Sequence, residues 1–249
     1  MSPSASLPAP LPSLNGVLND AIVSTGPLPG PGYDADTMSQ IVKTTGFRLC
    51  DPTQIEADDL AWFTDRERRQ LKAVMRWVRE FIMRPHPRLG RPGVVCPYVK
   101  LSLEAAIFYL SLTTLEDPRR YDEIYGLMHS HADIFTRMQP HSGPWENLRV
   151  MLVLMPNARE NILCDPEASK RLKTEMMQRG ITVGQFFPTW HPIRALKSKF
   201  FPNQPPLCLY TMRPFIRSDW MFINGEPEWR AVYLERFGQP PDSRQGFTV

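Results

Sequence analysis

Hydrophobic positions after Thr64 follow the period of an α-helix. Thr64 and Glu67 have the spacing of a capping box, in which a hydroxyl and a carboxylate bind the first free amides of a helix. Apolar residues then recur every three or four positions and predict one buried helix face: Leu71, Val74, Met75, Val78, Phe81 and Ile82. Pro85 and Pro87 are expected to end the helix. Basic residues occupy its other faces, and we interpret them as solvated: Arg66, Arg69, Lys72, Arg76 and Arg79.

Short apolar runs predict the strands of a sheet. A continuous run at residues 149–155 indicates a central strand, and we expect further strands at 106–113, 181–187 and 207–212, with a short edge strand at 47–49. Helices are predicted at 119–138, 165–179 and 227–237; Asp165 and Pro166 mark the start of the second, and Gly180 its left-handed end. This order predicts an α+β fold, a single domain with a central sheet of about four to five strands, helices packed on it and many proline-rich loops.

Proline is unusually frequent, with 26 in 249 residues, about twice the usual share. Residues 1–35 are rich in Pro, Ser, Gly and Ala and carry too few large apolar side chains to offset the entropy of folding, so we expect a disordered N-terminal extension. The single α+β domain is expected at residues 36–238, and a loose polar tail at 239–249.

Charge and composition limit the classes of partner that the protein is expected to bind. The formal net charge of +3 is too small by itself to indicate binding to nucleic acid. No run approaches the ~20 apolar residues that span a bilayer, and the N-terminus lacks the pattern of a secretory signal. The four cysteines form no C-x-x-C pair and are interpreted as reduced thiols. We therefore expect a cytoplasmic protein that binds a small molecule, and neither nucleic acid nor a membrane; the oligomeric state stays open.

Aromatic and basic residues gather in residues 184–224. Their prolines exclude a continuous helix, so we expect a shaped loop that holds cations against aromatic walls. This composition is typical of a pocket for a flat or anionic ligand. His191 stands on a proline-stiffened turn between Trp190 and Pro192. An imidazole there suits a haem iron, with Arg194, Lys197 and Lys199 near the haem propionates.

A second irregular stretch, residues 84–104, carries further pocket candidates: Arg91, Cys96 and Tyr98. Because Pro97 follows it, Cys96 is expected to be extended, with its sulfur presented from a loop. A cysteine in this setting can ligate haem as a thiolate, or it is simply a small buried apolar side chain. The sequence leaves both open.

Common catalytic motifs are missing from the sequence. There is no glycine-rich dinucleotide motif, no P-loop, no G-x-S-x-G and no H-E-x-x-H. His131 and Asp133 have the H-x-D spacing of non-haem iron sites. However, the residues around them have a helical pattern, and positions two apart on a helix lie about 200° apart around its axis. An iron site there would require an extended chain.

The sequence resembles a family known only as a domain of unknown function, DUF6875. Residues 91–99, RPGVVCPYV, match the family's R-x-G-x-V-C-P-F-V element, and residues 86–90, HPRLG, match the H-P-x-L-G that precedes it. The late G-E-F-H-P element corresponds to GQFFP, where Phe187 replaces the family's histidine. An R-x-M-x-x-x-D element is matched imperfectly around Arg213 and Asp219. The resemblance covers about residues 70–237 and implies no activity.

A more distant similarity points to a cofactor. Residues 191–200, HPIRALKSKF, resemble the H-P-x-x-x-R-x-S-R-R-F element of YqcI/YcgG-type haem proteins, which also carry an early Pro-Cys element. Characterised members of that group are haem-dependent oxygenases that act on amine or guanidine nitrogens of amino acids. The similarity implies haem b with His191 as the metal ligand. The substrate pocket would then be formed by Arg91, Cys96, Tyr98, Trp190 and Arg213.

Two functions follow as hypotheses. The first is a haem-binding oxidising enzyme of small-molecule metabolism that oxygenates an amine or amino acid. The alternative is a non-catalytic module that binds an anionic small molecule or a protein partner through segment 184–224. Salt-dependent binding without a chromophore would favour the second, because exposed charge contacts are screened by salt.

Overall fold

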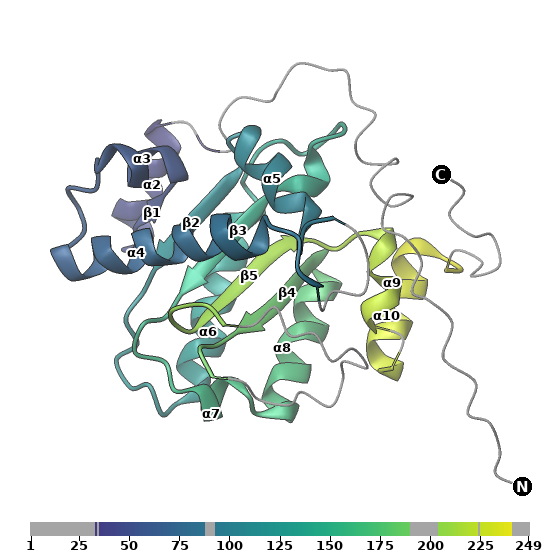
Figure 1. Ribbon diagram of the computed structural model, residues 1–249. Helices are drawn as coiled ribbons and strands as arrows, with labels where there is room; N and C mark the ends of the chain where they lie inside the picture. Colours follow the sequence, from purple (N-terminus) through teal and green to yellow (C-terminus); the bar gives the residue numbers. More distant parts are fainter. Residues whose placement is uncertain (1–32, 34, 88–92, 190–203, 224, 241–249) are drawn as a thin grey trace, which may run out of the picture.

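A computed structural model describes residues 33, 35–87, 93–189, 204–223 and 225–240. Within them the chain forms a five-stranded open sheet with the order β1-β2-β3-β5-β4 (Figure 1). β2 and β3 pair in parallel, and the other neighbours pair antiparallel. The predicted α+β single domain is confirmed, with the 149–155 run in the middle of the sheet. The strands are β1 (Leu49–Cys50), β2 (Phe108–Leu112), β3 (Val150–Leu154), β4 (Ile181–Phe186) and β5 (Leu209–Pro214).

Helices cover both faces of this sheet. Figure 1 shows α4 crossing one face and α6 and α8 lying against the other, in agreement with two separate hydrophobic cores. A third, smaller core joins the C-terminal helices α9 and α10 to the end of α8. The helices are α2 (Ala35–Thr45), α3 (Pro52–Ala57), α4 (Asp65–Trp77), α5 (Pro97–Glu104), α6 (Tyr121–Phe135), α7 (Glu160–Leu163), α8 (Pro166–Gln178), α9 (Trp220–Ile223) and α10 (Pro227–Phe237).

The middle strand explains why its sequence is a continuous apolar run. Successive side chains of a strand point to opposite faces. Met151 and Val153 therefore enter the core beside α6 and α8, whereas Leu152 and Leu154 enter the core beside α4. A strand covered on both faces has no solvated side, so no polar alternation survives in its sequence.

The helix predicted after Thr64 is α4. The Thr64 hydroxyl accepts from the Glu67 amide at 3.3 Å, and the Glu67 carboxylate accepts from the Thr64 amide at 2.8 Å, which completes the predicted capping box. Arg48 also binds the Glu67 carboxylate and, with the cap, lowers the pKa of Glu67 to about 2. Beyond Trp77 the helix continues as a π-helical turn, Val78–Ile82, and ends before Pro85 as expected.

The prediction of an irregular stretch at residues 84–104 is wrong for residues 97–104, which form α5. Cys96 has the expected extended backbone (φ −127°, ψ 106°), but it caps α5, and Pro97 occupies the first helical position. Proline is well placed there, since its missing N–H has no helical partner to lose. α3 is not predicted from the sequence either, although Asp51 forms a capping box with Gln54.

The ends of the chain fall mostly outside the described residues, including nearly all of the predicted extension 1–35 and most of the tail 239–249. Tyr33 is an exception. Its side chain is buried, and its hydroxyl donates to the carbonyl of Ile134 at 2.9 Å. The ordered packing of the domain therefore already includes Tyr33.

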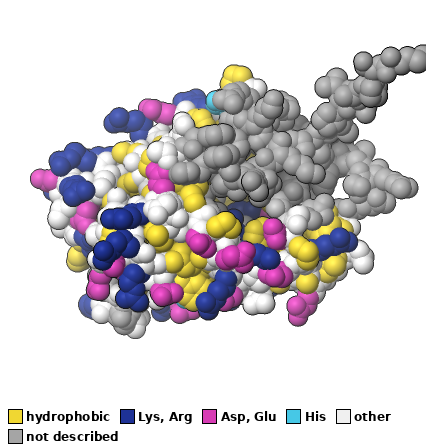
Figure 2. All heavy atoms as spheres, turned by 90° about the horizontal axis from the view of Figure 1, so that it is seen from below, with side chains coloured by type: hydrophobic (Ala, Val, Ile, Leu, Met, Phe, Trp, Pro, Cys, Tyr) yellow, Lys and Arg dark blue, Asp and Glu magenta, His cyan; other side chains and the backbone are white. Residues whose placement is uncertain are grey.

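Charges of both signs share the surface. In Figure 2 the described part of the face seen from below carries Lys, Arg, Asp and Glu side chains interspersed. Ion pairs between neighbouring helices, such as Lys170–Glu228 at 3.1 Å, are part of this pattern. No helix among the described residues is long and apolar enough to cross a membrane.

Candidate functional site

The structure describes part of the predicted pocket. Cys96, Tyr98 and Arg213 lie within the described residues. The remaining predicted site residues lie outside them: Arg91, Trp190, His191, Arg194, Lys197 and Lys199. The structure therefore gives no geometry for the predicted haem ligand and its propionate partners. It does give the geometry of three predicted pocket residues.

Tyr98 lies at the centre of that group. Its phenol, on the first turn of α5, has a hydrogen bond with Ser218 and interacts electrostatically with Arg213 and Cys96. Burial raises the pKa of Tyr98, while the Ser218 hydrogen bond and the Arg213 charge oppose this rise. The phenol therefore stays protonated at neutral pH and can act as a hydrogen-bond donor. Two distant segments of the chain thus meet around one phenol.

Arg213 is held by a buried carboxylate. Its Nη1 and Nη2 atoms donate to the two oxygens of Asp219 at 2.9 and 2.5 Å. Asp219 is 2% exposed and also accepts from the Thr182 hydroxyl and the Ile216 amide, both at 3.0 Å. Burial, the largest single influence, lowers the pKa of Arg213, but the charge of Asp219 and its hydrogen bonds together outweigh burial, and the net pKa is raised. Arg213 therefore stays protonated, and the carboxylate of Asp219 balances its positive charge. The side chain of Arg213 is 26% exposed.

The strand register places this group at one end of the β4–β5 pair. Arg213 lies opposite Thr182, whereas Phe186 lies opposite Leu209. Four residues of a strand separate the two positions, about 13 Å. Residues 190–203, which include His191, connect β4 to β5 at the Phe186 end. Arg213 and the two attachment points of the His191 segment therefore lie at opposite ends of the strand pair.

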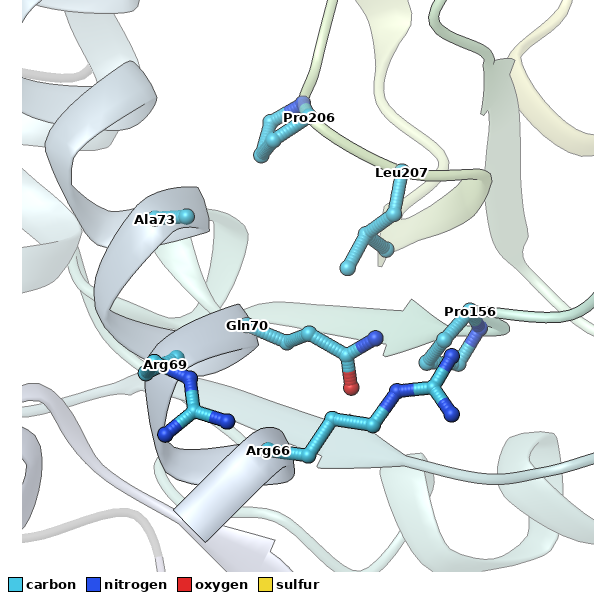
Figure 3. A pocket seen from close by; sticks show the side chains of 7 residues that line it. All are labelled: Arg66, Arg69, Gln70, Ala73, Pro156, Pro206 and Leu207. Carbon is cyan, nitrogen blue, oxygen red and sulfur yellow. The ribbon is translucent and has the colours of Figure 1, made fainter.

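A cleft of about 280 Å³ lies at the Phe186 end. Figure 3 shows Arg66 and Gln70 reaching from α4 across this cleft toward Pro156, with Leu207 opposite. Pro156 follows β3, and Leu207 precedes β5. We call this the basic cleft; its lining residues are Arg66, Arg69, Gln70, Ala73, Pro156, Pro206 and Leu207.

Arg66 and Arg69 are predicted from the sequence only as part of a solvated helix face. They are exposed, but they also line the basic cleft together with Gln70. A signal was present, since positions i, i+3 and i+4 lie on the same side of a helix. The opposite wall of the cleft comes from Pro156, Pro206 and Leu207, which lie far from α4 along the chain. No local sequence pattern predicts that they face these arginines.

The H-x-D pair does not form an iron site. His131 and Asp133 lie within α6, which confirms the predicted helix there. His131 is fully buried between the Ser111 hydroxyl and the Leu127 carbonyl, each 2.8 Å from a ring nitrogen. Asp133 is exposed and pairs with Arg179. Across the described ranges, no group of three or more His, Cys, Asp or Glu side chains could hold a metal ion.

Comparison with known proteins gives one match. The model of the family described as Domain of unknown function (DUF6875) matches residues 71–246, more than half of the chain. No curated protein and no solved structure matches significantly. The distant similarity to YqcI/YcgG-type haem proteins thus gains no support from a named relative. The matched region contains the group around Tyr98, while Arg66, Arg69 and Gln70 lie just before it.

Proposed function

Because the chain belongs to the DUF6875 family, whose description names no activity, we propose a function from its own residues: a haem-dependent oxidising enzyme of small-molecule metabolism. Its substrate would be an amine or amino acid that is oxygenated on nitrogen. His191 would ligate haem b, and the nearby cations would pair with the propionates: Arg194, Lys197 and Lys199. Haem, when bound, supplies the iron that activates oxygen.

The observation that supports this proposal is that Cys96, Tyr98 and Arg213 lie near enough to one another to interact electrostatically. These side chains come from segments far apart in the chain, and each was a candidate for the substrate pocket. They fit a polar substrate: the protonated phenol of Tyr98 can donate a hydrogen bond, and the guanidinium of Arg213 has N–H groups that Asp219 does not use. Because Asp219 neutralises Arg213, this residue would orient a ligand by hydrogen bonding more than by net charge.

A hemin titration followed by absorption spectroscopy tests the proposal. We expect the wild-type protein to develop a sharp Soret band that saturates at about one haem per chain, because the imidazole of His191 would ligate the iron. His191→Ala should lose this band, and His141→Ala, which changes an exposed histidine, should keep it. Loss of the band in Cys96→Ser alone would assign the ligand to the thiolate. No saturable band, or a band unaffected by both His191→Ala and Cys96→Ser, would overturn the haem proposal.

The basic cleft favours the alternative function, a module that binds an anionic small molecule. The described part of segment 184–224 contributes Pro206 and Leu207 to a cleft whose charged groups are both arginines. This function needs no haem and no catalytic group. If the hemin titration gives no saturable Soret band, this alternative function becomes the favoured hypothesis.

A further inference from the structure

We infer that the basic cleft binds the carboxylate or phosphate group of a small organic anion through Arg66 and Gln70, with Arg69 adding to the positive charge of the cleft. This inference gives the alternative function a ligand class and a site, and it holds whether or not the chain also binds haem. The observation behind it is the juxtaposition of two arginines and an amide from α4 with an apolar wall from Pro156, Pro206 and Leu207.

The place of the cleft in the fold suits a ligand. β2 and β3 are parallel, and the chain leaves the carboxyl end of β3 directly into Pro156. At the carboxyl ends of parallel strands, connecting loops diverge and leave crevices that ligands occupy. Gln70 and Arg66 extend from α4 into this crevice, on one side of the helix (Figure 3).

The charge of Arg66 in the cleft has no carboxylate partner. No Asp or Glu is among the lining residues, and Arg66 makes no ion pair within the part of the chain that the structure describes, whereas the charge of Arg69 acts on Asp65. The neighbouring carboxylates on α4 have other partners: Asp65 pairs with Arg68, and Glu67 pairs with Arg48. A guanidinium presents N–H groups in a planar fork that matches carboxylate and phosphate oxygens. In Figure 3 the Arg66 guanidinium and the Gln70 amide extend toward the same part of the cleft, whereas the Arg69 guanidinium points away from them. Arg66 and Gln70 therefore form the receptor for a single anionic group, and Arg69 adds to the positive charge around it.

The volume of the basic cleft and its apolar wall limit the size and the chemistry of the ligand. About 280 Å³ lies at the small end of ligand sites, so the cleft accommodates a small molecule and not an extended polymer. The prolines and Leu207 offer an apolar surface to the carbon skeleton of that molecule. Since the arginines are exposed, binding should weaken as salt rises.

The test is a titration at low ionic strength with two probes, inorganic pyrophosphate and glutarate, followed through the arginine side-chain Nε–H signals in NMR spectra. We expect at least one probe to shift the Arg66 and Arg69 signals saturably. Arg66 makes a charge-assisted contact, so Arg66→Gln should weaken binding about tenfold, and Arg66→Gln with Arg69→Gln should weaken it further, because the charge of Arg69 acts at longer range. Arg76→Gln, which removes an exposed arginine farther along α4, should leave the dissociation constant unchanged.

The pattern across probes and variants decides the outcome. Saturation by pyrophosphate alone assigns a phosphate ligand, saturation by glutarate alone a carboxylate, and saturation by both supports the site for either group. The inference is overturned if neither probe saturates, or if Arg76→Gln weakens binding as much as Arg66→Gln with Arg69→Gln does. Hemin binding is measured separately with His191→Ala, so failure of the haem proposal and failure of this site give different results.

Discussion

Asp219→Ala is expected to lower the free energy of unfolding by about 3 kcal/mol, because it leaves the Arg213 guanidinium largely desolvated without its counter-charge. The Thr182 hydroxyl and the Ile216 amide would lose their acceptor as well. An unmade hydrogen bond at a buried group costs more than the net gain from making it. Urea unfolding, with the midpoint and slope fitted together, measures the effect.

Two control variants separate this explanation from a general loss of charge. Asp133→Ala removes an exposed carboxylate that pairs with Arg179, and it should cost less than about 1 kcal/mol. Replacing both partners, Arg213→Met with Asp219→Leu, should recover much of the loss, since no unpaired charge stays buried. Equal destabilisation by Asp219→Ala and Asp133→Ala would show that the pair does not stabilise the end of β5.

The buried histidine should make the protein sensitive to acid. His131 is enclosed by the Phe47 ring, the Ser111 hydroxyl and the Leu127 carbonyl, none of which carries a charge. Burial lowers the pKa of His131 to about 4, against 6.5 in an exposed histidine, and the hydrogen bond to the Leu127 carbonyl only partly opposes this. Between these two values the unfolded chain binds a proton that the folded chain excludes.

The sign of the pH effect follows from that difference. Stability from the neutral imidazole is complete above pH 6.5, decreases as the pH falls, and is lost below about pH 4. The pKa difference corresponds to about 3 kcal/mol at full protonation. We expect the free energy of unfolding, measured by urea titration at several pH values, to fall by about this amount between pH 7 and pH 4 from His131 alone.

A variant without the titrating group isolates this contribution from that of the carboxylates. His131→Phe with Ser111→Ala fills a similar volume and removes both polar partners of the buried contact. Its stability should fall less steeply across the same pH interval, by about 3 kcal/mol in total. Parallel curves for the wild type and the double variant would mean that His131 is protonated without cost in the folded state.

Much of the secondary structure could be predicted from local sequence. The capping box at Thr64, the cap at Asp165 and the apolar run at residues 149–155 each correspond to an observed element. These signals arise among residues a few positions apart, so they act before the chain has any tertiary contacts. The same reasoning placed His131 and Asp133 on a helix and thereby excluded a shared iron ion.

Predictions from local sequence were wrong where a proline or a charged residue is compatible with two different structures. Pro97 was interpreted as part of an irregular loop, yet it opens α5, because proline both breaks a helix interior and suits a helix start. Arg66 and Arg69 were interpreted as solvated, yet they line a cleft. The composition of a helix face does not reveal what stands opposite it.

Local sequence patterns were enough to predict the fold class, most of the elements and the kinds of residue available for a site. Which residues become neighbours depends on tertiary packing: Tyr98 and Arg213, Arg213 and Asp219, and the arginines of α4 with Pro156 and Leu207. The physical reason is the distance along the chain over which each kind of interaction acts. Helix periods and caps act over one or two turns, whereas these contacts depend on strand register and on the packing of α4 across the sheet, which no short stretch of sequence contains.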